Sequence, residues 1–445
     1  MRRAVLGLGL NLLVVIAIFT VPVWAEDAPP PPAREQEPPL ERLFDPFQKE
    51  LQTSALPKFL RDTDLRVHFR TYYFNRNNPD DSKSEALATG GWITYQSGWL
   101  ADTFAMGATL YGSLKLYGPE DRDGTLLLKP SQESYVVPGE AWGALKYQDY
   151  VLVKGYRQQV NQGYINPADN RMTPNTFQGV TVGGKFEWLE YLGGFLWKIK
   201  PRNADEFISM SEQAGATDTN EGAGFGGVRL TPLPGLRIDI NDSYGVDTIN
   251  TFYTEVTYEL PLNQAMKIRL GAQFTDQRGV GDALLGATID GRHWATQHGA
   301  GRAQLVIGDL TLTGAFSFTG KGNNIQKPWG SSPSYLSLID QDFDRANEKA
   351  FLLGAAYDFS NVLLKGLSAT MNMAWGKDAI DPSNGTKAPD QGEYDLTVDY
   401  KPAFKWPAFL QGMWFRARGA ITDQQDARAT GYQVRLIINW ERDLF

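Results

Sequence analysis

Cysteine is absent from the chain of 445 residues, and histidine occurs only three times. Without cysteine, a disulfide framework and a thiolate metal site are excluded. His68, His293 and His298 stand in no recognisable Ser/His/Asp arrangement, which argues against a hydrolytic enzyme. A metal site at His293 and His298, with Asp290 nearby, is a weaker alternative to two surface-loop residues. We therefore expect no enzymatic activity, no cofactor and no metal.

Apolar runs and helical periodicity are scarce beyond the N-terminus. The mean hydropathy of −0.35 argues against a bundle of membrane helices. After residue 63, no stretch of ten or more residues follows a period of 3.6. The formal net charge is −8, and we expect no nucleic-acid partner.

The first 63 residues differ in composition from the rest. Residues 1–25 read "MRRAVLGLGLNLLVVIAIFTVPVWA", a basic start, an apolar core and small residues before Glu26. This pattern predicts a secretory signal peptide cut after Ala25, with a membrane anchor helix as the alternative. Residues 26–63 are rich in proline and charge and predict an extended periplasmic leader holding at most one short helix. Residues 64–445 form the remaining domain.

That domain is dominated by a period of two. In "DLRVHFRTYY", Leu65, Val67 and Phe69 alternate with polar residues, as expected of a strand with two different faces. About eighteen such segments follow one another. They are expected near 64–74, 91–99, 103–117, 141–149, 150–157, 177–187, 188–200, 222–232, 235–246, 250–260, 265–276, 298–308, 309–320, 349–359, 364–376, 392–401, 409–421 and 431–442.

Short and long connections alternate along these segments. Long polar connections are expected at 75–90, 118–140, 158–176, 201–221, 277–297, 321–348 and 377–391. An antiparallel up-and-down meander with its long loops at one end is typical of a transmembrane β-barrel, with short periplasmic turns and long external loops. The polar face carries too many charges for a dry core, so we expect it to line a wet lumen while the apolar face meets lipid. Aromatic residues near strand ends fit the interfacial girdles of such a barrel: Tyr72, Tyr73, Trp99, Tyr147, Tyr258, Tyr357, Trp375, Trp406 and Trp440.

Several lumenal positions are basic. The segment "MWFRARGA" places Arg416 and Arg418 two residues apart on one face, about 7 Å from each other. Closure of the barrel places the last strand, which carries Arg435, between this strand and the first strand, which carries Arg66 and Arg70. These arginines predict a basic ladder that guides anions through the lumen, and ion pairing with lumenal acids is the alternative. Other strands add Lys267, Arg269 and Arg302.

Four sequence stretches resemble one family. "DNRMTPNTFQGV" (169–180) resembles the segment after the third external loop of OprD-type outer-membrane porins. "TYQSGWL" (94–100), "RTYYFNR" (70–76) and "VRLIINW" are similar to other strands of that family. The resemblance spans roughly residues 60–445. It implies an eighteen-stranded barrel for passive, substrate-selective uptake of small carboxylate-bearing solutes, with Arg416, Arg418 and Arg435 in a basic ladder.

The same resemblance implies that the loop at 158–176 constricts the pore. It makes Tyr164, Asp169, Asn170 and Arg171 candidate constriction residues. The chain would lie in the outer membrane of a Gram-negative bacterium, as a monomer or weak trimer. Its partners would be anionic solutes, outer-membrane lipid and lipopolysaccharide, and the assembly machinery that reads a terminal aromatic such as Phe445. The alternatives are a plugged structural or adhesive barrel, with the loop at 321–348 as plug, and a fatty-acid-type transporter.

Overall fold

The computed structural model describes residues 57–285, 293–402, 410–424 and 429–444. The expected signal peptide, most of the leader, Asp290, Trp406 and Phe445 lie outside these residues. Among the described residues, no helix is both long enough and apolar enough to cross a membrane.

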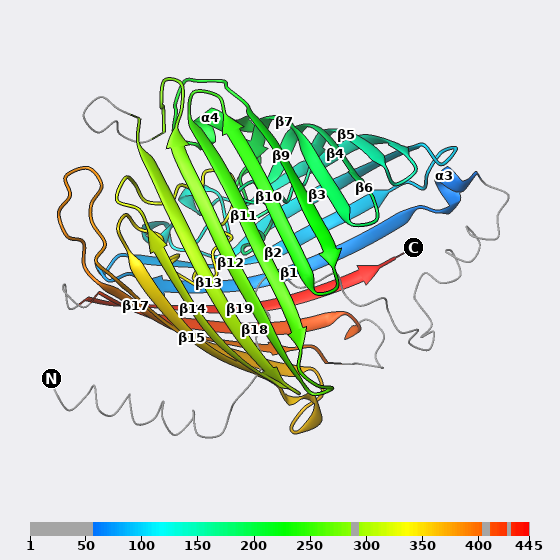
Figure 1. Ribbon diagram of the computed structural model, residues 1–445. Coiled ribbons are helices and arrows are strands. Elements are labelled where there is room, and N and C mark those ends of the chain that lie inside the picture. The colour runs from blue at the N-terminus through cyan, green and yellow to red at the C-terminus, as the bar shows by residue number, and fades with distance from the viewer. Residues whose placement is uncertain (1–56, 286–292, 403–409, 425–428, 445) are drawn as a thin grey trace.

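Eighteen antiparallel strands form one closed barrel, which confirms the predicted fold class (Figure 1). Each strand pairs with its neighbour in sequence, and β1 pairs with β19 to close the ring. The strands are β1 (Asp64–Asn77), β2 (Lys83–Gln96), β3 (Phe104–Tyr117), β4 (Tyr135–Tyr147), β5 (Val151–Gln158), β6 (Thr176–Lys185), β7 (Leu189–Lys200), β9 (Ala223–Leu233), β10 (Leu236–Gly245), β11 (Ile249–Pro261), β12 (Met266–Gly279), β13 (Ala295–Ile307), β14 (Leu310–Thr319), β15 (Lys349–Asp358), β16 (Leu367–Lys377), β17 (Gln391–Tyr400), β18 (Met413–Gln424) and β19 (Ala429–Asp443).

The remaining elements are short. β8 (Ile208–Ser209) adds two residues beside the end of β7, and α4 (Met210–Gln213) follows it, with Ser209 capping its first turn. Single turns of 3-10 helix occur at η1 (Glu120–Arg122), η2 (Pro130–Gln132) and η3 (Phe359–Asn361). Helix α3 (Lys58–Arg61) packs on the turn after β2, where Gly98 N donates to Phe59 O at 3.0 Å. The end of β19 lies at the same end of the barrel, because Leu444 N donates to Leu65 O.

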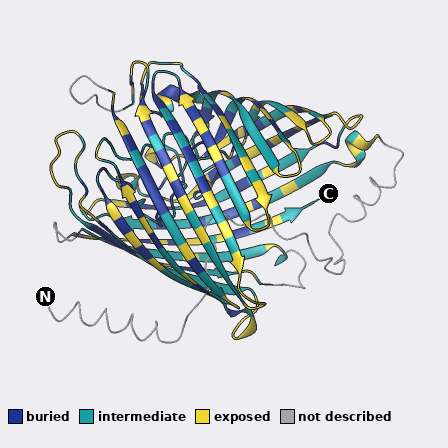
Figure 2. Cartoon of the chain, in the orientation of Figure 1, coloured by how far each residue is buried: buried dark blue, intermediate teal, exposed yellow. Residues whose placement is uncertain are grey.

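The two faces of the strands are sorted as the period of two predicts. Along β1, Phe69 is exposed on the outer face, whereas His68 and Arg70 are buried on the inner one. Figure 2 shows the resulting alternation of buried and exposed residues along the strands. One girdle assignment is wrong: Tyr72 is 1% exposed and lies on the inner face, in phase with Arg70. Proximity to a strand end could not distinguish it from Tyr73, its neighbour on the outer face.

The prediction of a first long connection at 75–90 is also wrong. Residues 83–90 belong to β2, so only residues 78–82 connect it to β1. The glycine pair in this stretch does not break the strand, because it lets neighbouring backbones approach closely. A Cβ on Gly90 would lie 2.2 Å from Gly112 O, and a Cβ on Gly91 would lie 2.0 Å from His68 O.

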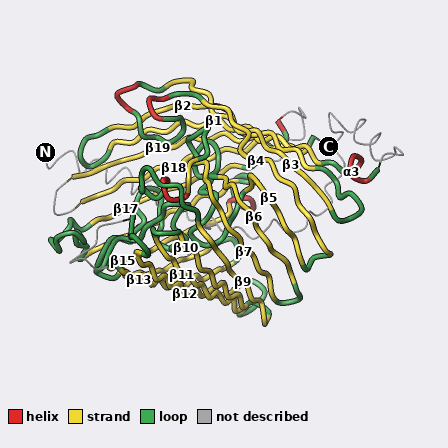
Figure 3. Tube along the Cα trace, turned by 90° about the horizontal axis from the view of Figure 1, so that it is seen from above, coloured by secondary structure: helices red, strands yellow, loops and turns green. Residues whose placement is uncertain are grey.

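Three loops at the long-loop end fold into the barrel: L3 (159–175), L4 (201–222) and L7 (320–348). Figure 3 shows loop segments inside the ring of strands. The three loops pack into an apolar cluster together with residues of the surrounding strands, and Ile165 of L3, Met210 of L4 and Trp329 of L7 all belong to it. Trp329 Nε1 donates to Met210 O at 2.8 Å, and Asn166 Nδ2 donates to Ser331 O at 2.9 Å. L3, L4 and L7 therefore interlock inside the ring of strands.

Candidate functional site

The arginines predicted for the basic ladder lie on three neighbouring strands, β18, β19 and β1. Arg418 stands directly opposite Arg435, and Arg435 stands opposite Phe74 on the next strand. One row closer to the short-turn end, Arg416 shares a row with Ile437 and Tyr72. Arg70 follows in the next row, opposite Asn439, and Arg66 lies near the end of the wall opposite Asp443. The five arginines thus descend one wall of the lumen.

The other predicted members lie on a different wall. Lys267 and Arg269 are on β12 and both contact Glu259 of β11, at 3.0 and 2.7 Å. Arg302 on β13 stacks on Tyr335 of L7, with its Cζ 4.0 Å from the ring centroid. Around the ring, β12 and β13 are far from β1, so the eight basic residues form two groups.

Carboxylates form ion pairs with several of these basic residues, as the ion-pairing alternative predicts. Arg416 binds Asp399 at two points, Nε to Oδ1 at 2.7 Å and Nη2 to Oδ2 at 3.1 Å. Arg66 contacts Asp64 and Asp443. Side chains held in this way have less charge to offer a passing solute.

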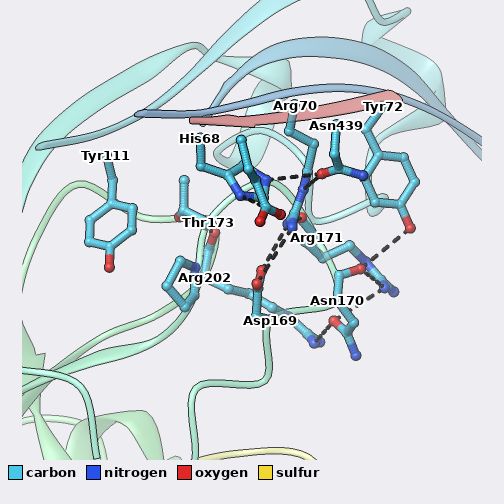
Figure 4. A network of polar contacts seen from close by, with 12 residues as sticks. His68, Arg70, Tyr72, Tyr111, Asp169, Asn170, Arg171, Thr173, Arg202 and Asn439 are labelled. Carbon is cyan, nitrogen blue, oxygen red and sulfur yellow. Dashed lines mark hydrogen bonds and ion pairs between the residues drawn. The ribbon is translucent and has the colours of Figure 1, made fainter. Parts of the chain in front are cut away.

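Loop L3 crosses the lumen between the two walls. Asp169 Oδ1 accepts from Arg70 Nη1 of β1 at 2.8 Å (Figure 4). At the other wall, the Tyr164 hydroxyl lies 3.1 Å from Thr275 Oγ1 of β12, and its ring meets Tyr253 of β11 edge-on. Of the four predicted constriction residues, Asp169, Asn170 and Arg171 therefore lie at the β1 wall, and Tyr164 lies at the wall facing it.

Arginines gather around Tyr72 and Phe74 at the β1 end of L3. We call this set the basic cluster: Arg70, Arg76, Arg171, Arg202, Arg418 and Arg435. The guanidinium carbons of Arg171 and Arg435 lie 5.1 Å from the Phe74 ring centroid, and that of Arg76 lies 6.0 Å away. The charges of Arg70, Arg171, Arg418 and Arg435 all act on the Tyr72 hydroxyl. Arg202 Nη1 reaches Asn170 Oδ1 at 2.5 Å (Figure 4).

Two members of the basic cluster were missed by the sequence reasoning. Arg76 continues the inner-face phase of Arg70, Tyr72 and Phe74, a pattern that could have revealed it had the first loop not been placed too early. Arg202 lies in L4, which has no periodicity, and nothing in the sequence marks it.

Arg70, Arg171 and Arg435 are the buried members of the basic cluster, with exposures of 7%, 8% and 3%, and Arg70 differs from the other two because it pairs with Asp169. Arg171 donates to Thr125 O and to oxygens of Asn170. Arg435 donates to Gln433 Oε1 at 3.0 Å and to Ile339 O of L7 at 2.5 Å. Within the described part of the chain, neither guanidinium meets a carboxylate. Burial and the positive charges of Arg435, Arg202 and Arg76 lower the pKa of Arg171 well below its usual value.

Loop L7 is fastened to the lumen wall at several points. Glu393 of β17 accepts from the backbone N–H groups of Asp340 and Gln341, at 2.9 and 2.7 Å. Gln273 of β12 donates to Pro333 O at 2.8 Å. Within L7, Lys327 bridges Asp342 and Asp344. We call this three-residue group the L7 clasp.

The histidines make ordinary polar contacts. His68 stacks on Trp92 and lies 3.1 Å from Glu441, and His298 contacts Thr319 and Ser334. His293 Nδ1 lies 2.9 Å from Gly279 O. Among the described residues, no group of three or more His, Cys, Asp or Glu side chains could hold a metal ion.

Comparison with known proteins agrees with this architecture. The family described as "outer membrane porin, OprD family" matches residues 57–444. Porin D of Pseudomonas aeruginosa is 26% identical over 356 residues, which cover 75% of this chain and 76% of that protein.

The fold recurs in solved structures. OccK9 (OpdG) of Pseudomonas aeruginosa superposes with a TM-score of 0.77 at 21% identity, over 87% of this chain and all of that one. OccAB1 of Acinetobacter baumannii gives 0.78 at 17% identity, over 88% of this chain and all of that one. OpdK of Pseudomonas aeruginosa, in a structure with vanillate, gives 0.76 at 18% identity, over 86% and 100%.

These relatives are channels of the Gram-negative outer membrane and not enzymes. They favour a porin over the plugged structural barrel and the fatty-acid-type transporter. The eighteen-stranded barrel, with its polar lumen and inward-folded loops, belongs to the OprD family of outer-membrane porins.

Proposed function

We propose that the chain is a channel for passive, substrate-selective uptake of small carboxylate-bearing solutes along the arginines of β18, β19 and β1. One observation carries the proposal. Arg171 and Arg435 are buried in the lumen and, within the described residues, donate hydrogen bonds only to neutral oxygens. A buried positive charge without a counter-charge is costly, and a passing anion lowers that cost.

The chemistry of these side chains fits a carboxylate. A guanidinium in water stays charged at every physiological pH, and its planar fork can donate two parallel hydrogen bonds to the two oxygens of a carboxylate. An anion beside Arg171 opposes the lowering of its pKa by burial and so favours the charged form. Arg418 stands directly opposite Arg435, a like-charge pair that is unfavourable by itself. The pair becomes favourable when an anion lies between the two guanidinium groups.

The vertical arrangement of the arginines suits passage. Residues two apart on a strand are separated by about 7 Å, so a solute that leaves the row of Arg418 and Arg435 meets Arg416 and then Arg70. Asp399 on Arg416 and Asp169 on Arg70 compete for the same guanidinium groups. This competition keeps each site shallow, and conduction requires sites that the solute can leave.

The wall of the lumen at β4 and β5 suggests that the solutes include aromatic carboxylates. Lys146 Nζ lies 4.3 Å from the ring centroid of Trp99, and Lys154 Nζ lies 4.2 Å from that of Trp142. A planar aromatic acid can stack on such rings while its carboxylate meets the ammonium group. The structure of OpdK with vanillate, an aromatic carboxylate, supports this class.

Ion selectivity in a planar lipid bilayer tests the proposal. We expect R171Q and R435Q each to lower the anion-to-cation permeability ratio by about tenfold, because each removes one charge-assisted contact of ~1.5 kcal/mol. R435K, which keeps the charge, should retain most of the selectivity. R278Q is the matched control, because Arg278 is 62% exposed and pairs with Asp276 outside the basic cluster.

An unchanged reversal potential in both R171Q and R435Q would contradict the proposal. Uptake of benzoate and of neutral benzyl alcohol into proteoliposomes separates charge selection from pore size. Equal slowing of both solutes by R435Q would mean that the variant only deforms the pore.

A further inference from the structure

A large hollow lies on the outer, lipid-facing wall of the barrel, away from the lumen. Its volume is about 680 Å³, and it spans strands β11 to β15. Two rows of outward-facing residues build it. The upper row runs Val256, Ala272, Gly301, Phe316, Phe351, and the lower row runs Tyr258, Leu270, Ala303, Gly314, Leu353.

Small residues form the floor of this hollow and large apolar residues form its sides. Ala272, Ala303 and Gly314 occupy the middle strands, whereas the ring of Phe316 covers Gly301, since a Cβ there would lie 2.6 Å from it. A Cβ built on Gly314 meets nothing within 4 Å, so the space above it is open. A hollow in a lipid-facing wall cannot hold water stably, because its lining offers almost no hydrogen-bonding groups.

Two lysines stand directly above the hollow at the long-loop end. Lys349 of β15 lies opposite Lys377 of β16, two residues above Phe351 and Trp375, which are also opposite each other. Lys349 pairs with Asp378 at 2.9 Å, whereas Lys377 is exposed and has no ion pair within the described residues. The ammonium groups of Lys349, Lys387 and Lys377 together lower the pKa of Asp378. Lys387 in turn contacts Asp390.

The aromatic neighbours of the lysine pair indicate its position along the membrane normal. Trp375 Nε1 donates to the Tyr394 hydroxyl at 3.1 Å, and the two rings meet edge-on. Such amphipathic aromatic residues sit at the boundary between hydrocarbon and headgroups. The lysines therefore lie at the headgroup level of the outer leaflet, and the hollow lies at the level of the acyl chains beneath it.

We propose that this wall binds a phosphorylated glycolipid of the outer leaflet, lipid A, with one acyl chain in the hollow and a phosphate between Lys349 and Lys377. Asp378 pairs with Lys349, so a phosphate between the two lysines gains a charge-assisted contact with Lys377 and competes with Asp378 for Lys349. Two like charges opposite each other on neighbouring strands favour such an additional anion. Hydrocarbon fills the hollow and restores the dispersion contacts that an empty space forfeits. A second copy of the chain would supply the apolar filling without supplying an anion at the lysine pair.

Native mass spectrometry of the delipidated full chain, titrated with bis-phosphorylated lipid A, tests the proposal. We expect the wild type to bind one lipid tightly, and K349Q/K377Q to bind it about tenfold or more weakly. The double variant should bind a phosphate-free analogue of the lipid as the wild type does. G314L should weaken binding of both lipids because the leucine occupies the hollow.

The control variant is G419L on β18. Gly419 also faces outward, and its Cβ would make only an ordinary contact of 3.7 Å with Gln433 O. We expect its lipid binding and its channel conductance to equal those of the wild type. Conductance should also survive in G314L, since Gly314 lies outside the lumen.

Three results would overturn the proposal. Undiminished binding of lipid A by K349Q/K377Q would exclude the phosphate site, and undiminished binding by G314L would exclude the acyl-chain site. An oligomer of the wild type that G314L dissociates in detergent would assign the hollow to a second copy.

Discussion

The L7 clasp allows the most direct test of what keeps L7 docked inside the barrel. The perturbation is K327M, which removes the ammonium group and keeps most of the side-chain volume. Lys327 Nζ lies 2.8 Å from Asp342 Oδ2 and 2.5 Å from Asp344 Oδ2. The side chains of Lys327 and Asp344 are only 22% and 8% exposed. K327M therefore leaves two carboxylates close together without their cation.

Removing one partner of a buried ion pair costs roughly 3–5 kcal/mol. We take the lower end, about 3 kcal/mol, because Lys327 retains some contact with solvent. At 1.4 kcal/mol for each factor of ten, the population of undocked L7 should rise about 100-fold. The bonds from Glu393, Gln273 and Arg435 remain in place, so docked L7 should persist as one of two states.

Single-channel recording measures this change. K327M should show frequent transitions to a higher conductance level, and limited chymotrypsin digestion, whose sites both lysine variants leave unchanged, should cut within residues 320–348 faster than in the wild type. K321M is the matched control, because Lys321 is an exposed lysine of the same loop. The double variant K327M/D344N should recover part of the wild-type behaviour, because it removes one of the carboxylates that K327M leaves unpaired. Conductance and digestion of K327M identical to those of the wild type would refute the reasoning.

Three further outcomes are expected. Burial raises the pKa of Asp344 to about 7 from an ordinary value of 3.8, so between these two pH values docked L7 binds a proton that free L7 does not. Docking should therefore weaken as the pH rises from about 4 to 7, and D344N should abolish this dependence of single-channel open time. The double variant R416Q/R418Q should lose anion preference and slow carboxylate uptake, because it also leaves the Asp399 carboxylate without its arginine; an unchanged reversal potential would count against the ladder. N166A should uncouple L3 from L7, because Asn166 Oδ1 accepts from Ser331 N and Oγ. The lost contacts cost on the order of 1–3 kcal/mol and should make the single-channel conductance noisier, and a variant as quiet as the wild type would contradict this expectation.

The strands of this protein could be predicted because the alternation of polar and apolar residues within each strand reflects the two environments on its two faces. Lipid on one side and a polar lumen on the other impose a period of two that is visible within ten residues. The same alternation sets the inward phase of Arg416, Arg418 and Arg435. Where it is weak, the prediction failed: "KSEALATG" at 83–90 looks like a polar loop, yet it extends β2 because its glycines allow close packing of backbones.

The candidate site could be predicted only in part. Adjacency of β18, β19 and β1 follows from closure of the ring, and it placed five arginines on one wall. The joining of Arg70 to Asp169 and of Arg435 to Ile339 O could not be foreseen, because L3 and L7 carry no periodicity. Arg202 in L4 was missed for the same reason.

The sequence by itself determined the number of strands, the inward or outward direction of most strand side chains and the two solvents that the barrel separates, because these depend on local alternation. Only the tertiary structure decided which arginines meet a carboxylate, because that depends on how neighbouring strands and inward-folded loops bring side chains together, as they bring Arg70 to Asp169, 99 positions away. The same holds for the hollow on the outer wall. Ala303 and Gly314 are unremarkable in sequence, and they form a site only because the register of β13 and β14 places them side by side.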